Sequence, residues 1–207
     1  MLASKRQIKK NINNQNGLNS IWTESLARNL HPNCNALVDH LKTIHQENTG
    51  FTEACASSCR DEAGRNSYEW LSEVVPDNAS LSVLDLACGS GPLLKILFDR
   101  NKNLNLKGID MCPEELVIAK TRLKNSGVNL IESKAQNLTA INDSSIDIVL
   151  CHWALTLMEP IAPVLDEVRR VLTSKGRFAA LVDGPMNSAP GYKEAVSYTH
   201  LTLPTKA

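Results

Sequence analysis

The chain has 207 residues, of which 43% are hydrophobic and 21% charged, proportions that suit one globular domain with a sizeable core. Its 22 basic and 22 acidic side chains cancel, so no overall positive charge would attract nucleic acid or an anionic membrane. No run of eighteen apolar residues predicts a membrane-spanning helix, and the N-terminus lacks the apolar core of a signal peptide. Nucleic-acid binding and membrane insertion are therefore both disfavoured.

Six cysteines stand at positions 34, 55, 59, 88, 112 and 151. Cys88, in a glycine-containing loop, and Cys151, at the end of a predicted core strand, are expected to be small apolar fillers. We therefore predict reduced thiols and a cytoplasmic location. Cys55 and Cys59 share a helix face, but two thiols without two further ligands at matching spacing are a weak zinc signal, and no metal site is predicted.

Residues 1–20 are polar, carry four basic side chains and no acid, and are predicted to form a disordered arm. An organelle-targeting peptide is the alternative, weakened by the scarcity of serine and of spaced arginines. Residues 21–75 are predicted to be mainly helical, with a break at residues 31–32. The two apolar stripes that predict these helices are Ile21, Trp22, Leu26 and Leu30, and then Leu37, Leu41 and Ile44.

Residues 83–91 read VLDLACGSG and run into Pro92 and a further apolar stretch. The pattern predicts a short buried strand, a glycine turn and a helix that begins at the proline, whose missing N–H suits a helix N-terminus. Gly89 and Gly91 let the backbone approach a ligand and adopt positive φ, while the free N–H groups of the new helix would point toward it. This loop is the predicted ligand-binding element.

A second signal lies 19 residues beyond Gly91, where an apolar alternation ends in Asp110. An acid at the tip of the second strand of such a unit can accept hydrogen bonds from both ribose hydroxyls. The dinucleotide-binding fingerprint has a third glycine at the position where this chain has Leu94. In addition, the Asp85 carboxylate would repel a pyrophosphate and attract an ammonium group. The two signals together favour S-adenosylmethionine over NAD as the nucleoside ligand.

The rest of the chain continues the alternation of strands and helices. The helix that begins at Pro113 carries acids in its first turn and stops at residues 125–127. The helix of residues 161–172 has a buried stripe, with the charges of residues 166–170 expected on a solvated face. The remaining predicted strands are residues 128–132, 146–150 and 177–182, and residues 174–176 are predicted to end the preceding helix.

Residues 85–91 with Asp110 resemble the nucleoside-binding signature of class I S-adenosylmethionine-dependent methyltransferases, in the broad subgroup that acts mostly on small molecules. Further matches follow in the family's order at residues 135–138, 145–150 and 165–176, and the resemblance spans roughly residues 65–185. It implies an α/β fold: a Rossmann-like three-layer αβα sandwich with a mostly parallel sheet and an N-terminal helical lid.

The resemblance also implies a set of cofactor contacts. The methionine part would lie at Asp85 and the glycine loop, the ribose at Asp110, and the adenine at residues 135–137, which could otherwise be a plain strand-to-helix loop. An acid often stands in the family where this chain has Lys134. The implied cofactor-binding residues are Asp85, Ala87, Cys88, Gly89, Gly91, Asp110, Met111, Ala135, Gln136, Asn137 and Cys151.

Segments before the first strand of such a unit often fold over the ligand, and residues 51–61 are the candidate lid. Arg60 could pair with the ligand's carboxylate and Tyr68 could pack or hydrogen-bond nearby. A capped surface helix with a solvated arginine and aspartate is the alternative.

The fourth strand delivers His152 and Trp153 to the carboxyl edge of the sheet, where ligands bind in open α/β folds. His152 is the candidate general base toward an acceptor, and Trp153 could flank the substrate. The alternative is that His152 is a hydrogen-bonded structural residue and Trp153 a core residue. The expected activity is methyl transfer to an unidentified small molecule; a noncatalytic nucleoside-binding or assembly protein and a nicotinamide-dependent reductase remain as alternatives.

The family's sheet usually has seven strands, and the segment after strand five is too short for the remainder, so we expect an incomplete domain. Residues 196–207 resemble a translated sequencing-adapter end, although an edge strand is the alternative. The expected organisation is an arm at residues 1–20, a helical lid segment at 21–75, the S-adenosylmethionine-binding domain at 76–195 and a foreign tail at 196–207. The sequence does not indicate the oligomeric state.

Overall fold

A computed structural model describes residues 20–28, 30, 34–78 and 80–182. The predicted tail at residues 196–207, and all but the last residue of the predicted arm at 1–20, lie outside the described residues. Those described fall into two compact units, one up to Ile44 and one from His45 onward. None of the described helices is long and apolar enough to cross a membrane.

The first unit contains α2 (Ile21–Ala27) and most of α3 (Cys34–Glu47). The predicted stripe of Leu37, Leu41 and Ile44 is buried, as its helical spacing requires. Ile21 and Leu30 of the other predicted stripe are exposed and Trp22 is half-buried, so these three residues do not form a buried face.

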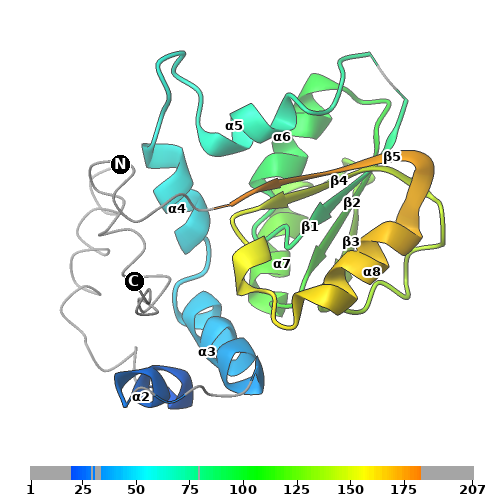
Figure 1. The fold of residues 1–207 in the computed structure, drawn as a ribbon. Coiled ribbons are helices and arrows are strands. Elements are labelled where there is room, and N and C mark those ends of the chain that lie inside the picture. The colour runs from blue at the N-terminus through cyan, green and yellow to red at the C-terminus, as the bar shows by residue number, and fades with distance from the viewer. Residues whose placement is uncertain (1–19, 29, 31–33, 79, 183–207) are drawn as a thin grey trace. The chain divides into compact units, whose positions relative to one another are not determined.

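The second unit is built on five parallel strands in the order β3-β2-β1-β4-β5. Figure 1 shows the strands running side by side, with helices on both faces of the sheet. The strands are β1 (Ser82–Leu86), β2 (Asn105–Asp110), β3 (Asn129–Glu132), β4 (Ile146–His152) and β5 (Leu172–Leu181). The helices are α4 (Phe51–Ser58), α5 (Ser67–Ser72), α6 (Pro92–Arg100), α7 (Pro113–Arg122) and α8 (Ile161–Val171), with a short 3-10 helix at Leu155–Leu157.

The two faces of the sheet are covered by different helices. Successive side chains of a strand point to opposite faces. Val83 packs in a core with residues of α5, α6 and α7, whereas Leu84 and Leu86 pack in a second core with α8 and residues 135–141. The three-layer αβα architecture implied by the sequence is confirmed, and its sheet is entirely parallel.

The prediction that the last helix runs to residue 176 was wrong. The structure ends α8 at Val171 and begins β5 at Leu172, which pairs with Ile146. The register then shifts, so that Arg177 pairs with Ile148. Gly176 lies within this irregular stretch, where a Cβ would be 2.8 Å from Leu172 Cδ2. The glycine marks a crowded bulge in a strand rather than the end of a helix.

Close packing of α6 on the sheet depends on Gly108 of β2. A Cβ at this position would lie 2.6 Å from Leu94 Cδ1 of α6 and 2.9 Å from Cys88 Sγ. The missing side chain therefore lets the start of α6, and the loop before it, lie directly against β2.

Candidate functional site

Three adjacent strands place polar side chains on the same face of the sheet. Asp85 of β1 pairs in register with Gly108 of β2 and Leu150 of β4. Two residues further along these neighbouring strands stand Asp110 and His152, which therefore point to the same face as Asp85. Because parallel strands share a carboxyl edge, the sheet gathers these three groups where ligands bind in this fold class.

The glycine loop, residues 87–91, has a strongly constrained backbone. Ala87, Gly89 and Gly91 have φ of 61°, 50° and 77°, in the left-handed region that favours glycine. The N–H of Gly91 donates to Cys88 O at 2.9 Å, and the N–H of Cys88 donates to Ile109 O at 2.9 Å. The amides of Cys88 and Gly91 are thus used within the protein, which fixes the loop before any ligand is present.

Asp110 joins this loop to the end of β2. Its Oδ2 accepts from the Gly89 N–H and its Oδ1 accepts from the Cys112 N–H, both at 2.8 Å. Burial raises the pKa of Asp110, and the two backbone N–H groups act in the opposite direction. The side chain stays partly exposed, and each oxygen keeps a lone pair. Asp110 can therefore accept further hydrogen bonds from hydroxyl groups of a ligand.

Asp85 is the most unusual group of the site. Its side chain is only 2% exposed, and its Oδ1 has no hydrogen-bond partner. Burial raises the pKa of Asp85 to about 8, and the nearby charge of Asp110 adds to the effect. A buried carboxylate oxygen without a partner is costly unless a ligand supplies one. The environment therefore fits a cationic N–H donor such as an ammonium group.

His152 and Trp153 lie at the end of β4 beside α5. The His152 ring stacks on the Tyr68 ring with 3.8 Å between the ring centroids. The centroid of the Trp153 ring lies 4.8 Å from that of His152. His152 Nε2 is 2.8 Å from Ser67 Oγ, while its buried Nδ1 has no partner. Burial lowers the pKa of His152 to about 3. The imidazole is consequently neutral and a weak proton acceptor in this environment.

Residues 135–137 follow β3 and are held close to Asp110. The Ser133 N–H donates to Asp110 O at 3.0 Å, and Ser133 Oγ donates to Asn137 O at 2.6 Å. Ala135 is buried, Gln136 is half-buried and Asn137 is exposed. This turn thus lies next to the ribose candidate, as an adenine-contacting segment would.

Of the α8 charges expected on a solvated face, Asp166 and Arg169 are exposed, whereas Glu167 and Arg170 bind the segment at residues 138–141. Glu167 Oε2 accepts from the Leu138 N–H at 2.6 Å. Arg170 donates to Leu138 O at 2.9 Å and to Ile141 O at 3.0 Å. The two side chains tie residues 138–141 to α8.

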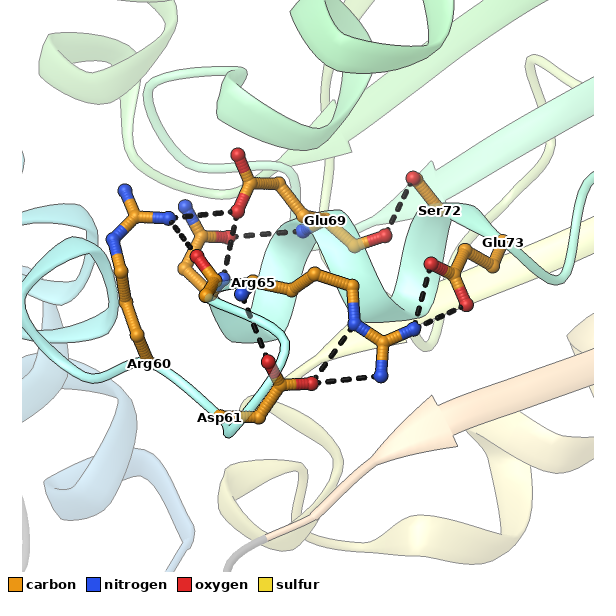
Figure 2. A network of polar contacts seen from close by, with 8 residues as sticks. Arg60, Asp61, Arg65, Glu69, Ser72 and Glu73 are labelled. Carbon is orange, nitrogen blue, oxygen red and sulfur yellow. Dashed lines mark hydrogen bonds and ion pairs between the residues drawn. The ribbon is translucent and has the colours of Figure 1, made fainter.

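Arg60 has partners on the surface of the unit. Its Nη1 donates to Gly64 O at 2.6 Å and to Glu69 Oε2 at 3.0 Å, and the side chain is 49% exposed. Figure 2 shows it in a polar network with Asp61 and Arg65. Asn66 and Glu69 form a capping box at the start of α5. Arg60 thus lies between α4 and α5, half-exposed and paired with Glu69, which fits the solvated arginine of the alternative interpretation.

Two charged groups near the glycine loop, the buried Glu115 and the half-buried Arg122, were missed by sequence reasoning. Glu115 accepts from the Gly50 N–H at 2.9 Å, and Arg122 donates to Ser90 O at 2.9 Å. Their spacing of seven residues places both on one face of α7, which is a signal in the sequence. The spacing does not show what that face of α7 contacts. From the sequence, Glu115 and Arg122 therefore look like ordinary charged residues at the ends of a helix.

Residues 84–180 match the family described as "Methyltransferase domain". The match begins in β1 and ends in β5, and so contains the whole carboxyl edge described above. This segment is a class I S-adenosylmethionine-dependent methyltransferase domain.

Two curated relatives and one solved structure extend this comparison. Demethylmenaquinone methyltransferase of Thermotoga maritima is 34% identical over 120 residues, covering 58% of this chain and 49% of the relative. Malonyl-[acyl-carrier protein] O-methyltransferase of Pectobacterium atrosepticum is 29% identical over 137 residues, covering 64% and 52%. An S-adenosylmethionine-dependent methyltransferase structure from Mesorhizobium loti has a TM-score of 0.52 at 23% identity, covering 60% of this chain and 57% of that one, and supports the fold. The chain thus spans about half the length of the curated relatives it matches.

Proposed function

We propose that this protein is an S-adenosylmethionine-dependent methyltransferase that acts on a small-molecule acceptor. The observation that carries the proposal is the buried Asp85, whose Oδ1 lacks a partner beside a glycine loop fastened by Asp110. A pyrophosphate would be repelled by this carboxylate, whereas the ammonium group of the methionine part would satisfy it. The family match over residues 84–180 supports the same ligand.

In this proposal the bound S-adenosylmethionine supplies a methyl group on a sulfonium sulfur, open to in-line attack by an acceptor. Asp85 binds the ammonium group, Asp110 the ribose hydroxyls, and residues 135–137 the adenine. Ala87, Cys88, Gly89 and Gly91 form the wall beside the methionine part, with Met111 and the backbone of Cys151 flanking it; the Cys151 side chain is buried in the core with α8. The protein contributes mainly proximity, orientation and exclusion of water.

His152 and Trp153 are proposed to face the acceptor, with Tyr68 behind them. A neutral imidazole with Nδ1 unpaired can donate or accept one hydrogen bond, which suits orientation of an uncharged acceptor. Its low pKa makes proton abstraction a poor use of this side chain, so we propose orientation as its role. Arg60 is not assigned to the carboxylate of the methionine part, because its partners are Gly64 and Glu69.

The charge of the chain and the names of its relatives support the proposed acceptor class. The chain has no net charge with which to attract a polyanion. The two curated relatives are named for demethylmenaquinone and for malonyl-[acyl-carrier protein], neither of which is a nucleic acid. We propose a small organic acceptor and, from the cysteine usage, a cytoplasmic location.

Calorimetric titration with S-adenosylhomocysteine tests the proposal, run beside Asp110→Ala and beside NADH. Binding by the native chain that is weakened at least tenfold in Asp110→Ala and absent for NADH would support it. Binding of NADH instead would support the reductase alternative. Failure of the folded native chain to bind S-adenosylhomocysteine would contradict the proposal, and product formation with an acceptor would separate an enzyme from a noncatalytic binder.

A further inference from the structure

An ion pair between distant parts of the chain lies against the glycine loop. Glu53 of α4 and Arg122 of α7 are 69 positions apart, and Arg122 Nη2 donates to both carboxylate oxygens of Glu53 at 2.9 and 2.7 Å. Their side chains are 29% and 23% exposed, so the pair is largely removed from water. A two-point, partly buried contact of this kind is more directional than an exposed ion pair.

Both partners of this pair also hold Ser90, the residue between the two loop glycines. Ser90 Oγ donates to Glu53 Oε2 at 2.8 Å. Arg122 Nη1 donates to Ser90 O at 2.9 Å. The side chain and the carbonyl of one buried loop residue are thus fixed by two different helices.

A second contact joins the start of α4 to the first turn of α7. The N–H of Gly50, which precedes α4, donates to Glu115 Oε1 at 2.9 Å, and His45 Nδ1 lies 3.1 Å from the same oxygen. Glu115 stands in the first turn of α7 and Arg122 is its last residue. A Cβ at Gly89 would lie 3.9 Å from Glu115 Oε2. The first turn of α4 and the residue before it are therefore attached to both ends of α7.

We propose that Glu53 and Arg122 are positioning residues that hold Ser90, and with it the glycine loop, in the shape that binds the methyl donor. The same contacts fix α4 as a lid over that loop. This inference rests on the proposed function for the identity of the ligand. The loop geometry itself does not depend on it.

The physical argument concerns what happens when one partner is removed. Loss of the Glu53 carboxylate leaves the Arg122 guanidinium and Ser90 Oγ without their main acceptor in a partly buried place. Ser90 then loses its side-chain restraint, and the flanking Gly89 and Gly91, which tolerate φ of either sign, let this part of the loop leave the observed shape. Only a fraction of molecules would keep the binding shape, and the apparent affinity falls by that fraction.

The experiment uses the full chain with Glu53→Gln, Arg122→Gln, the double variant and Ser90→Ala. Glu73→Gln is the matched control, since Glu73 pairs with Arg65 at 2.8 Å on the exposed surface (Figure 2). Three quantities are measured: affinity for S-adenosylhomocysteine by calorimetry, urea unfolding without ligand, and amide hydrogen exchange of residues 50–58 and 88–91 without ligand.

We expect Glu53→Gln and Arg122→Gln each to weaken binding about tenfold, and the double variant to be little worse, because the two residues act as one unit. Ser90→Ala, the mildest change, should weaken binding about threefold, and Glu73→Gln less than twofold. Amide exchange should rise in both segments for the Glu53 and Arg122 variants only. Lower unfolding midpoints with native affinity and native exchange would overturn the inference.

The two proposals fail in different ways. If the native chain does not bind S-adenosylhomocysteine, the proposed function fails, while the exchange measurement still tests the positioning role. If the native chain binds and the Glu53 and Arg122 variants bind equally well, the positioning role fails and the function stands.

Discussion

The backbone N–H of Gly89 donates to Asp110 Oδ2 at 2.8 Å, so the acid that ends β2 also shapes the loop that follows β1. Asp110 Oδ1 accepts from Cys112 at the same time and starts the turn into α7. One carboxylate thus joins two strands and a helix at the carboxyl edge of the sheet. A residue assigned to ribose by its position is in this way also part of the scaffold.

Replacing Asp110 by asparagine should therefore impair both the loop and the ligand site. The amide has one acceptor oxygen and one donor nitrogen, so one of the two backbone N–H groups would face a donor. We expect affinity for S-adenosylhomocysteine to fall at least tenfold and the free energy of unfolding to fall by about 1–3 kcal/mol. Calorimetry and urea unfolding measure these, with the exposed Asp99→Asn as control. Native affinity in the Asp110 variant would contradict the ribose assignment.

Gly108→Ala should destabilise the protein through crowding alone. The added Cβ would meet Leu94 Cδ1 at 2.6 Å, and Cys88 Sγ and Leu130 Cδ2 at 2.9 Å, so these three packed side chains must move. Overpacking of this kind costs about 1–3 kcal/mol. Gly127→Ala is the contrasting variant, because its φ of 75° is unfavourable for alanine but the surrounding space is open. Equal affinity for ligand in wild type and Gly108→Ala would show that the loop tolerates the shift.

The strands and the glycine loop were predictable because their signals are local. A short apolar run indicated β1 and apolar alternation indicated β2, and Pro92, Gly89 and Gly91 mark the turn between β1 and α6 in the sequence. The placement of Asp85 and Asp110 on one face follows from strand alternation once the strands are aligned in parallel.

The start of β5 and the Glu53–Arg122 pair were not predictable from local patterns. Residues 172–176 contain the threonine, serine, lysine and glycine that commonly end a helix, and only pairing with Ile146 makes Leu172 a strand residue. Glu53 and Arg122 each look like a solvated helix charge. Their contact exists because the fold brings α4 and α7 to the same loop, which no single segment specifies.

His152 should make the protein sensitive to acid. Its pKa is lowered to about 3 in the folded state by burial, against an ordinary value of 6.5, so its contribution to stability is present above pH 6.5 and lost as the pH falls toward 3. His152→Phe keeps a ring on Tyr68 and removes this titration. We expect wild type to lose about 2 kcal/mol more stability than His152→Phe between pH 7 and pH 5.

Urea unfolding at the two pH values measures this difference. Ser67→Ala is the control, since it removes the contact of Ser67 Oγ with His152 Nε2 without removing the titrating ring. The control should keep the acid sensitivity of the wild type. If the free energy of unfolding depends on pH in the same way in wild type and His152→Phe, the pKa of His152 is not lowered in the folded state, and the prediction is wrong.

Asp85 should produce the opposite pH dependence. Burial raises its pKa to about 8 in the folded state, against about 4 in an unfolded chain, so the native state holds the extra proton between these values. Stability is then highest at the acid end of this window and falls as the pH rises toward 8. Asp85→Asn removes the titration, and we expect wild-type stability relative to the variant to fall by on the order of 3 kcal/mol from pH 5 to pH 8.

Ligand binding should also change the protonation of Asp85, which a stability measurement does not detect. A bound ammonium group favours the ionised form of Asp85, so binding of S-adenosylhomocysteine near pH 7 should release a proton, and affinity should rise with pH up to about 8. Calorimetry in two buffers of different ionisation enthalpy measures that proton. Asp85→Asn should release none and should bind at least tenfold more weakly, even where it is the more stable protein. Proton release that is unchanged in Asp85→Asn would assign the ammonium group to another acceptor.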